Sequence, residues 1–317
     1  MTTAESGALP PVSVIMAVYN GERYVAEAVE SVLRQTHEDF EFIIVNDGSI
    51  DRTQAILDGY AARDGRIRVI NQANVDQPAS LNRALRATSN DWVAVLDADD
   101  ICVPRRLETQ LRALQWLPSV RVLGSYAFWM DQAGRNRGIR PLGPTSIPEF
   151  EKLVERGGRI AIVHPSVMMH RPTILALGGY DPKFGAAADM ELWSRVSDEH
   201  VVISLPEPLV YYRFQSESMS ATRFFEQQLM LRWSEARQIA RRRGLVPPTL
   251  EEYFKSPGGR FALRRLNQLR KDWKEYLKFR KRLESWRGRR LRALLIRAVA
   301  MPLSPRVFAR RVFARRH

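Results

Sequence analysis

Three carboxylates stand close together in the run Asp97-Ala98-Asp99-Asp100, directly after the apolar segment 92–96. Like charges this close repel one another unless a cation lies among them. Ligand sets made only of oxygen favour Mg²⁺ or Mn²⁺, which bind through one or two carboxylates together with substrate phosphates. The run therefore indicates a divalent-metal site for a phosphorylated ligand. A solvated acidic turn that caps the following helix is the alternative.

Strand-like and helical segments alternate along the first 117 residues. Strand-like runs cover 12–18, 41–46, 67–71 and 92–96, and helical spacing covers 24–35, 53–63, 79–87 and 105–117. This alternation predicts right-handed βαβ units, and therefore an α/β fold with a mostly parallel sheet flanked by helices. Ligands of such sheets bind at the carboxyl ends of the strands.

Polar residues follow each of the four predicted strands, and most of them are acidic. They are Tyr19 and Asn20 after the first strand, Asp47 after the second, Asn74 and Asp76 after the third, and Asp97 to Asp100 after the fourth. Because the strands are predicted to be parallel, we expect these residues to share one rim. The alternatives are a core position for Tyr19, turn formation by Asn20 and Asp47, and loop capping by Asn74.

The pattern becomes less regular beyond residue 117. The glycine- and proline-rich stretch 134–148 predicts a long loop. Ordered structure is expected again at 160–170, 201–205 and 209–214, with a helix at 189–197. We expect one domain over 1–220, followed by a basic helical extension over 221–317 in which helices alternate with Pro/Gly breaks.

The net charge of +14 is distributed unevenly along the chain. Residues 223–317 contain 27 basic and 7 acidic residues, whereas residues 1–222 contain 22 basic and 28 acidic residues. In the extension, Arg and Lys alternate with aromatic and Leu residues, as in helices that lie on anionic membrane surfaces. A packed appendage with a solvated basic face is the alternative. Nucleic acid is not the expected partner, because the basic character belongs to the extension alone.

The sequence also indicates the cellular compartment in which the protein is expected. The single cysteine, Cys102, excludes an intrachain disulfide framework and a cysteine-based structural zinc site. Residues Met1 to Pro11 lack the basic start and apolar run of a signal peptide, and no apolar stretch approaches the roughly 20 residues of a spanning helix. We therefore expect a cytoplasmic protein that reaches the inner face of the plasma membrane through its basic extension.

Five short segments, in order along the first 220 residues, closely resemble glycosyltransferase family 2. They are Val12 to Gly21, Ser31 to Thr36, Ile44 to Thr53, Asn74 to Asn82 and Leu96 to Asp100. The resemblance implies a GT-A-type, Rossmann-like fold, a nucleotide-diphospho-sugar donor with UDP as the expected nucleotide, and inverting transfer assisted by Mg²⁺ or Mn²⁺. It further implies a glycan or lipid-linked acceptor, in bacterial surface polysaccharide or lipid-linked glycan synthesis.

The resemblance also implies donor-side roles for individual residues. Ala17, Tyr19 and Asn20 would border the nucleotide base, and Asp47 would contact the base edge. Asn74 would lie in the donor loop, and Asp97 would face the ribose or uracil side. Asp99 would bind the metal, and Arg213 would reach the diphosphate. A metal that bridges two phosphates neutralises charge on the leaving diphosphate, which agrees with the role of Asp99.

Inversion by direct displacement needs a base that takes the proton of the acceptor hydroxyl. The segment from Gly178 to Trp193 resembles the acceptor-side segment of the family, which implies that Asp189 is this base. Glu191 is the second candidate for an acceptor-side carboxylate, and His164 matches a position near the acceptor. A helix N-cap for Asp189 and a purely structural role for His164 are the alternatives.

Three positions depart from the family pattern: Ala188 replaces a usual Glu, Gln215 a frequent His and Asp76 a common Gly. These departures leave open a non-catalytic protein on the same fold that binds nucleotide-sugars or nucleic acid. The retained donor-side acids and Asp189 favour an enzyme. A dinucleotide-binding oxidoreductase is disfavoured, because Tyr-Asn-Gly-Glu and not G-x-G-x-x-G follows the first strand.

Overall fold

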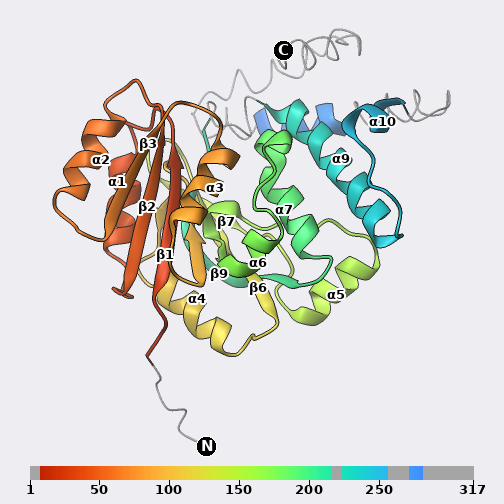
Figure 1. Ribbon diagram of the computed structural model, residues 1–317, viewed down its shortest axis with the longest axis horizontal. Helices are drawn as coiled ribbons and strands as arrows, with labels where there is room; N and C mark the ends of the chain where they lie inside the picture. The colour runs from red at the N-terminus through yellow and green to blue at the C-terminus, as the bar shows by residue number, and fades with distance from the viewer. Residues whose placement is uncertain (1–7, 216–222, 256–270, 281–317) are drawn as a thin grey trace, which may run out of the picture.

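The computed structural model describes residues 8–215, 223–255 and 271–280 (Figure 1). Within these residues, nine strands form one sheet in the order β3-β2-β1-β4-β8-β6-β9-β5, with β7 paired to β6. The strands are β1 (Val12–Val18), β2 (Phe40–Asp47), β3 (Ile67–Gln72), β4 (Trp92–Val95), β5 (Ile101–Cys102), β6 (Val120–Met130), β7 (Asn136–Arg140), β8 (Met168–His170) and β9 (Val201–Arg213).

Helices surround this sheet. The α-helices are α1 (Val25–Leu33), α2 (Thr53–Ala61), α3 (Gln77–Ala87), α4 (Arg106–Gln115), α5 (Ile147–Glu155), α6 (Arg171–Ala176), α7 (Ala188–Val196), α9 (Phe224–Arg242) and α10 (Leu250–Lys255), and the 3₁₀ helices are η1 (His164–Ser166) and η2 (Pro182–Ala187). Residues 271–280 form one further helix.

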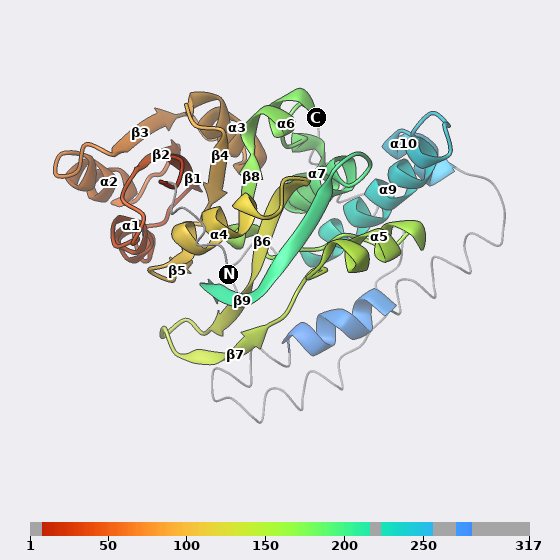
Figure 2. The same ribbon diagram turned by 90° about the horizontal axis from the view of Figure 1, so that it is seen from below.

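The first half of the sheet is parallel, as the alternating pattern predicts. β1 pairs in parallel with β2 on one side and with β4 on the other, and β2 pairs in parallel with β3. Every residue of β1 is buried, because α1 and α3 cover opposite faces of this half (Figure 2). Burial on both faces explains why the strand is a continuous apolar run instead of an alternating one. The predicted α/β fold is confirmed.

Beyond β4 the sheet is mixed. β8 runs antiparallel to β4 and β6, while β6 runs parallel to β9. Strand β6 was not predicted, and part of the predicted 134–148 loop is strand β7, which pairs with β6. The segments 201–205 and 209–214 belong to one strand, β9, whose register with β6 shifts where Pro206 and Pro208 interrupt the hydrogen-bonding pattern.

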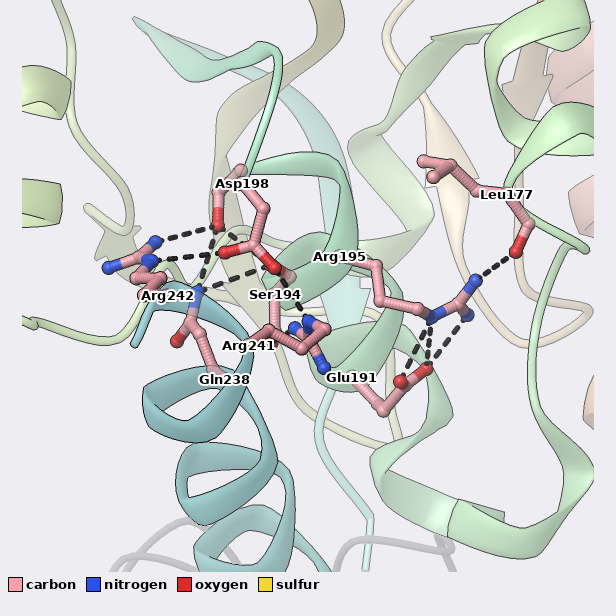
Figure 3. A network of polar contacts seen from close by, with 9 residues as sticks. Leu177, Glu191, Ser194, Arg195, Asp198, Gln238, Arg241 and Arg242 are labelled. Atoms are coloured by element: carbon pink, nitrogen blue, oxygen red, sulfur yellow. Dashed lines mark hydrogen bonds and ion pairs between the residues drawn. The ribbon is translucent and has the colours of Figure 1, made fainter. Parts of the chain in front are cut away.

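The first helix of the basic extension, α9, packs against the part of the chain that contains the sheet. Leu229, Met230 and Trp233 join the same hydrophobic core, and the Trp233 ring stacks on Phe184 at 4.4 Å between centroids. Asp198 forms ion pairs of 2.7 Å with Arg241 and 3.0 Å with Arg242 (Figure 3). These arginines therefore serve intramolecular packing.

The helix at 271–280 is tied to the same part of the structure. Asp272 pairs with Arg232 of α9 at 2.7 Å, and Phe279 contacts Phe214, directly after β9, at 4.6 Å between ring centroids. Residues 216–222, 256–270 and 281–317 lie outside the described residues. Across the described ranges, no helix combines the length and apolarity needed to cross a membrane. The boundary near residue 220 stays a prediction.

Candidate functional site

The acidic run lies between β4 and β5, at the carboxyl end of β4, as predicted. The turn closes through a backbone hydrogen bond from Asp100 N to Asp97 O at 3.1 Å. Asp100 is buried, and its Oδ1 accepts a hydrogen bond from the backbone N of Arg213 at 2.7 Å. Its Oδ2 is also buried and has no hydrogen-bond partner among the residues that the structure describes. A buried carboxylate oxygen without a donor is costly unless a cation or another donor reaches it.

Arg213, at the end of β9, supports this turn from within the protein. Its Nε donates to Asp99 O at 2.7 Å, and a terminal nitrogen lies 2.6 Å from Glu27 Oε2. Its guanidinium also lies 4.2 Å from the centroid of the Tyr24 ring. The side chain is 3% exposed. The structure therefore shows Arg213 holding the acidic turn, and its contact with a diphosphate stays a prediction.

Asp99, the predicted metal ligand, is crowded by the other carboxylates of the turn. Burial and the neighbouring Asp97 raise the pKa of Asp99 to about 6, and burial with both neighbours raises the pKa of Asp100 well above its ordinary value. Gln215 Nε2 donates to Asp99 Oδ2 at 2.7 Å, so the position that departs from the family pattern lies directly on this carboxylate.

The crowded carboxylates and the orphaned Asp100 oxygen fit a divalent cation. No group of three His, Cys, Asp or Glu side chains suited to a metal occurs in the part of the chain that the structure describes. Mg²⁺ commonly needs only one or two carboxylates when substrate phosphates complete its shell. The residues present therefore fit a metal that is bound together with a phosphorylated ligand.

At the ends of β1 and β2, a second set of predicted residues forms the neighbouring wall. Asn20 adopts a left-handed conformation with φ of 51°, which Asn tolerates better than most residues. Its Oδ1 accepts from Ile50 N at 2.9 Å, and its backbone N donates to Ser49 Oγ at 2.9 Å. Tyr19 beside it is 51% exposed, whereas Ala17 is buried within β1. The exposed ring is available to a ligand, and the core alternative for Tyr19 is excluded.

Asp47 and Asn74 are brought together at the ends of β2 and β3. The Asp47 carboxylate accepts from Gln72 Nε2 at 2.7 Å and from Val75 N at 3.0 Å. Asn74 Nδ2 donates to the backbone oxygen of Asp47 at 2.9 Å. A Cβ atom at Gly48, whose φ is 73°, would lie only 2.6 Å from Asn74 N, so a larger residue there would displace this loop. Through these hydrogen bonds Asp47 holds the end of β3 and the loop after it, which form this wall of the site.

The acceptor-side residues meet the acidic run at the same rim. His164 Nδ1 lies 3.5 Å from Asp97 Oδ1, and His164 Nε2 lies 3.1 Å from the Tyr180 hydroxyl. Asp189 lies in the first turn of α7, half-buried. Burial raises the pKa of Asp189, the His164 charge lowers it and the Asp97 charge raises it again, with a raised pKa as the result. Asp97, His164 and Asp189 therefore act on one another electrostatically.

Glu191 lies elsewhere, in a structural ion pair. It is 2% exposed, and its two carboxylate oxygens accept hydrogen bonds from Arg195 at 2.8 to 2.9 Å (Figure 3). Arg195 also donates to the backbone oxygens of Leu177 and Gly179. Two helical residues place Glu191 about 200° around α7 from Asp189. This buried carboxylate anchors Arg195 and the turn before η2, and the acceptor contact of Glu191 stays a prediction.

Glu191→Gln is accordingly expected to affect stability more than chemistry. Removing the charge should lower the free energy of unfolding by about 1.5–3 kcal/mol, because Arg195 loses a charged hydrogen-bond partner. Urea denaturation measures this change, and nucleotide affinity of the folded protein should stay within about twofold of wild type, well under 1 kcal/mol. A variant of normal stability that had lost transfer would instead support the predicted acceptor role of Glu191.

Three contacts of the site were not predicted from the sequence. Tyr180 meets His164, Gln77 Nε2 donates to Asp97 Oδ1 at 3.2 Å, and Glu27 pairs with Arg213. Asp76, which departs from the family pattern, caps α3 by accepting from Ala79 N at 2.7 Å and so positions Gln77 in the first turn. An Asp followed by Pro two residues later is a recognisable helix start. The proximity of Gln77 to Asp97, however, depends on the strand order, which the sequence does not give.

Comparison with known proteins agrees with this geometry. The family model described as glycosyl transferase family 2 matches residues 13–176. An uncharacterized glycosyltransferase of Methanocaldococcus jannaschii is 32% identical over 225 residues, which cover 69% of this chain and 76% of that protein. An uncharacterized glycosyltransferase of Haemophilus influenzae is 30% identical over 233 residues, covering 69% and 70%.

Two solved structures share the fold. A mannosyltransferase of Pyrobaculum calidifontis, solved with GDP-Man and Mn²⁺, aligns with a TM-score of 0.55 at 17% identity over 97% of this chain and 80% of that one. Residues 1–349 of S. aureus TarS, solved with UDP-GlcNAc, align with a TM-score of 0.55 at 16% identity over 87% of this chain and 83% of that one. At these identities the likeness concerns the GT-A-type fold.

Proposed function

Because the chain belongs to glycosyl transferase family 2 and is a glycosyltransferase, we propose that it transfers a sugar from a nucleotide-diphospho-sugar to an acceptor hydroxyl with inversion. The observation that carries the proposal is that His164 lies beside Asp97 of the acidic turn, and that Asp189 is within electrostatic reach of both. A protein that only bound the donor would have no need of the half-buried carboxylate opposite the acidic turn.

The donor is proposed to lie along the carboxyl ends of β1, β2 and β4. The nucleotide base would contact the exposed Tyr19 ring, with Ala17 and Asn20 at its border and Asp47 with Asn74 at its edge. Asp97 would face the ribose. UDP is the proposed nucleotide, because a carboxylate at the base edge can accept from the N–H of uracil. TarS was solved with UDP-GlcNAc, whereas the mannosyltransferase was solved with GDP-Man.

Mg²⁺ or Mn²⁺ is proposed to be held by Asp99 together with the donor diphosphate. When bound, such an ion neutralises charge on the diphosphate as it leaves. The chain itself contributes the position of the carboxylate. Arg213 fixes the backbone of the turn through Asp99 O and Asp100 Oδ1, and Gln215 orients Asp99 Oδ2.

Asp189 is the proposed base. It would accept the proton of the acceptor hydroxyl while the acceptor oxygen forms its bond to the anomeric carbon, and the bond from that carbon to the diphosphate oxygen breaks. The raised pKa of Asp189 makes it a stronger base than an exposed aspartate. Attack from the face opposite the leaving group accounts for the proposed inversion. His164, beside Asp97 and within electrostatic reach of Asp189, would line the acceptor side.

A thermal-shift screen of nucleotide-sugars with and without Mn²⁺ tests the donor class and the metal together. Ligands that bind only the folded state raise its apparent stability, by about 2.7 kcal/mol at a concentration of 100 Kd. We expect UDP-sugars to raise the melting temperature, and Mn²⁺ to enlarge that shift. Stabilisation by GDP-sugars alone would change the assigned nucleotide, and a shift independent of Mn²⁺ would contradict the metal role of Asp99.

We propose that the acceptor is a glycan or lipid-linked molecule of surface polysaccharide synthesis, met at the cytoplasmic face of an anionic membrane. Of the 27 basic residues from 223 onward, 16 lie in 256–270 and 281–317, outside the described residues. Since Arg232, Arg241 and Arg242 are paired internally, other basic residues of the extension would supply the attraction.

The full chain is expected to cosediment with phosphatidylserine vesicles at low salt and to dissociate at high salt, because screening weakens attraction between exposed charges. Neutral phosphatidylcholine vesicles are the control. Equal binding to both vesicles, or binding to neither, would contradict an electrostatic membrane contact. A packed appendage with a solvated face would then be the better description of the extension.

A further inference from the structure

His164 lies between two hydrogen-bonding groups that come from distant parts of the chain. Asp97 Oδ1 is 3.5 Å from its Nδ1, and the Tyr180 hydroxyl is 3.1 Å from its Nε2. Tyr180 is 2% exposed, and the Asn82 side chain holds its backbone by donating to Tyr180 O at 2.7 Å and accepting from Tyr180 N at 2.8 Å. The hydroxyl therefore has a fixed position against the imidazole ring.

The chemistry of the two neighbours selects one tautomer of neutral His164. A carboxylate only accepts, so the ring nitrogen facing Asp97, Nδ1, carries the proton. Neutral imidazole has a single N–H, which leaves Nε2 as an acceptor for the Tyr180 hydroxyl. Burial raises the pKa of Tyr180 well above its ordinary value, so the hydroxyl keeps its proton and can donate. Histidine in water prefers the opposite tautomer, with the proton on Nε2.

The surroundings hold both rings in place. The Trp193 ring lies 6.5 Å from the centroids of His164 and of Tyr180. Burial and Arg106 lower the pKa of His164, whereas Asp97 and Asp189 raise it, with a net rise. Asp97 Oδ1 also receives the hydrogen bond from Gln77 Nε2. The Gln77 hydrogen bond and the nearby His164 Nδ1 together orient the Asp97 carboxylate.

We propose that Tyr180 is a positioning residue for sugar transfer: its hydroxyl holds His164 as the Nδ1–H tautomer, and His164 thereby orients Asp97 toward the donor. The inference rests on the proposed function, which assigns Asp97 to the donor. Tyr180 touches neither the donor nor the reacting atoms in this assignment and acts through His164. The contacts from Tyr180 through His164 to Asp97 link the acceptor-side segment to the donor side.

The tautomer can be measured by ¹⁵N NMR of the full chain without any substrate. His164→Gln identifies the His164 signals among those of the five histidines. At a pH above the His164 transition, we expect Nδ1 to be protonated in wild type and the Nε2–H form to gain population in Tyr180→Phe. Tyr60→Phe is the control, because it removes a hydroxyl that donates to Glu30 Oε1 at 2.9 Å on an exposed surface.

Asp97→Asn tests the other end of the series and should also weaken the Nδ1–H preference, which keeps the inference testable if Tyr180→Phe folds poorly. A wild-type His164 with its proton on Nε2 would overturn the inference. With UDP as the probe, calorimetry should show about 2- to 10-fold weaker binding to Tyr180→Phe, the worth of one hydrogen bond. If wild-type His164 has the Nδ1–H tautomer but Tyr180→Phe binds UDP as tightly as wild type, the positioning role of Tyr180 is refuted.

The experiments distinguish a wrong assignment of the donor from a wrong assignment of Tyr180. If wild type shows the Nδ1–H tautomer but binds no UDP, the assignment of His164 stands and the proposed donor is wrong. If UDP binds and the tautomer is Nε2–H, the proposed donor stands and Tyr180 has no positioning role.

Discussion

Asp189→Asn is expected to lower kcat for sugar transfer by about 10²- to 10⁴-fold, the usual contribution of a general base. The amide keeps the shape of the side chain but cannot take the acceptor proton. Donor affinity, measured by calorimetry with UDP and Mn²⁺, should stay close to that of wild type, because Asp189 is proposed to face the acceptor and not the donor.

The pH profile gives this prediction a second readout. Transfer requires ionised Asp189, so kcat should fall as the pH drops through the pKa of this carboxyl. Because burial raises that pKa, the fall should occur at a higher pH than for an exposed aspartate. The residual activity of Asp189→Asn should lack this acidic limb.

Asp181→Asn is the matched control for Asp189→Asn. Asp181 lies in the same segment, and its Oδ1 accepts a local hydrogen bond from Lys183 N at 3.0 Å. Its replacement should leave kcat within about twofold of wild type, a difference well under 1 kcal/mol in the barrier. Full activity of Asp189→Asn, or equal losses in both variants, would contradict the assignment of Asp189 as the base.

Asp99→Ala is expected to abolish the Mn²⁺-dependent part of UDP binding. At a ligand concentration of 100 Kd, wild type should gain about 2.7 kcal/mol of stability, and a 100-fold weaker variant only about 0.4 kcal/mol. Thermal shifts with UDP, with and without Mn²⁺, measure this difference. The ligand-free variant should be at least as stable as wild type, because one of three crowded carboxylates has been removed.

Asp91→Ala controls for the loss of a negative charge near β4. Asp91 is exposed and precedes β4, at the end opposite the acidic turn, so its replacement should leave the Mn²⁺ effect intact. Asp99→Asn separates charge from shape, since an amide can still contact Gln215. Retention of the full Mn²⁺ effect in Asp99→Ala would remove Asp99 from the metal site.

The sequence by itself determined the first half of the fold and the position of the acidic turn. Both depend on local patterns: the buried run of β1, the helical spacing of α1 and the polar residues directly after each strand. The parallel order followed because successive βαβ units are right-handed. Residue type and the parallel direction of the strands were therefore enough to expect Tyr19, Asp47 and Asp97 at one rim, whereas the strand order came from the structure.

Only the tertiary structure decided which long-range contacts hold the residues of the site in place. Arg213 reaches Asp99 across 114 positions of sequence, and Asn82 clamps Tyr180 across 98, so no local pattern reports either contact. The sequence pattern that made Glu191 a candidate is the same one that places Arg195 one helical turn away to neutralise it. Strand β6 went unrecognised because its place depends on pairing with β8 and β9, which lie far along the chain. Residue type and spacing encode what each segment is, whereas long-range packing sets which of its groups face the ligand and which face the core.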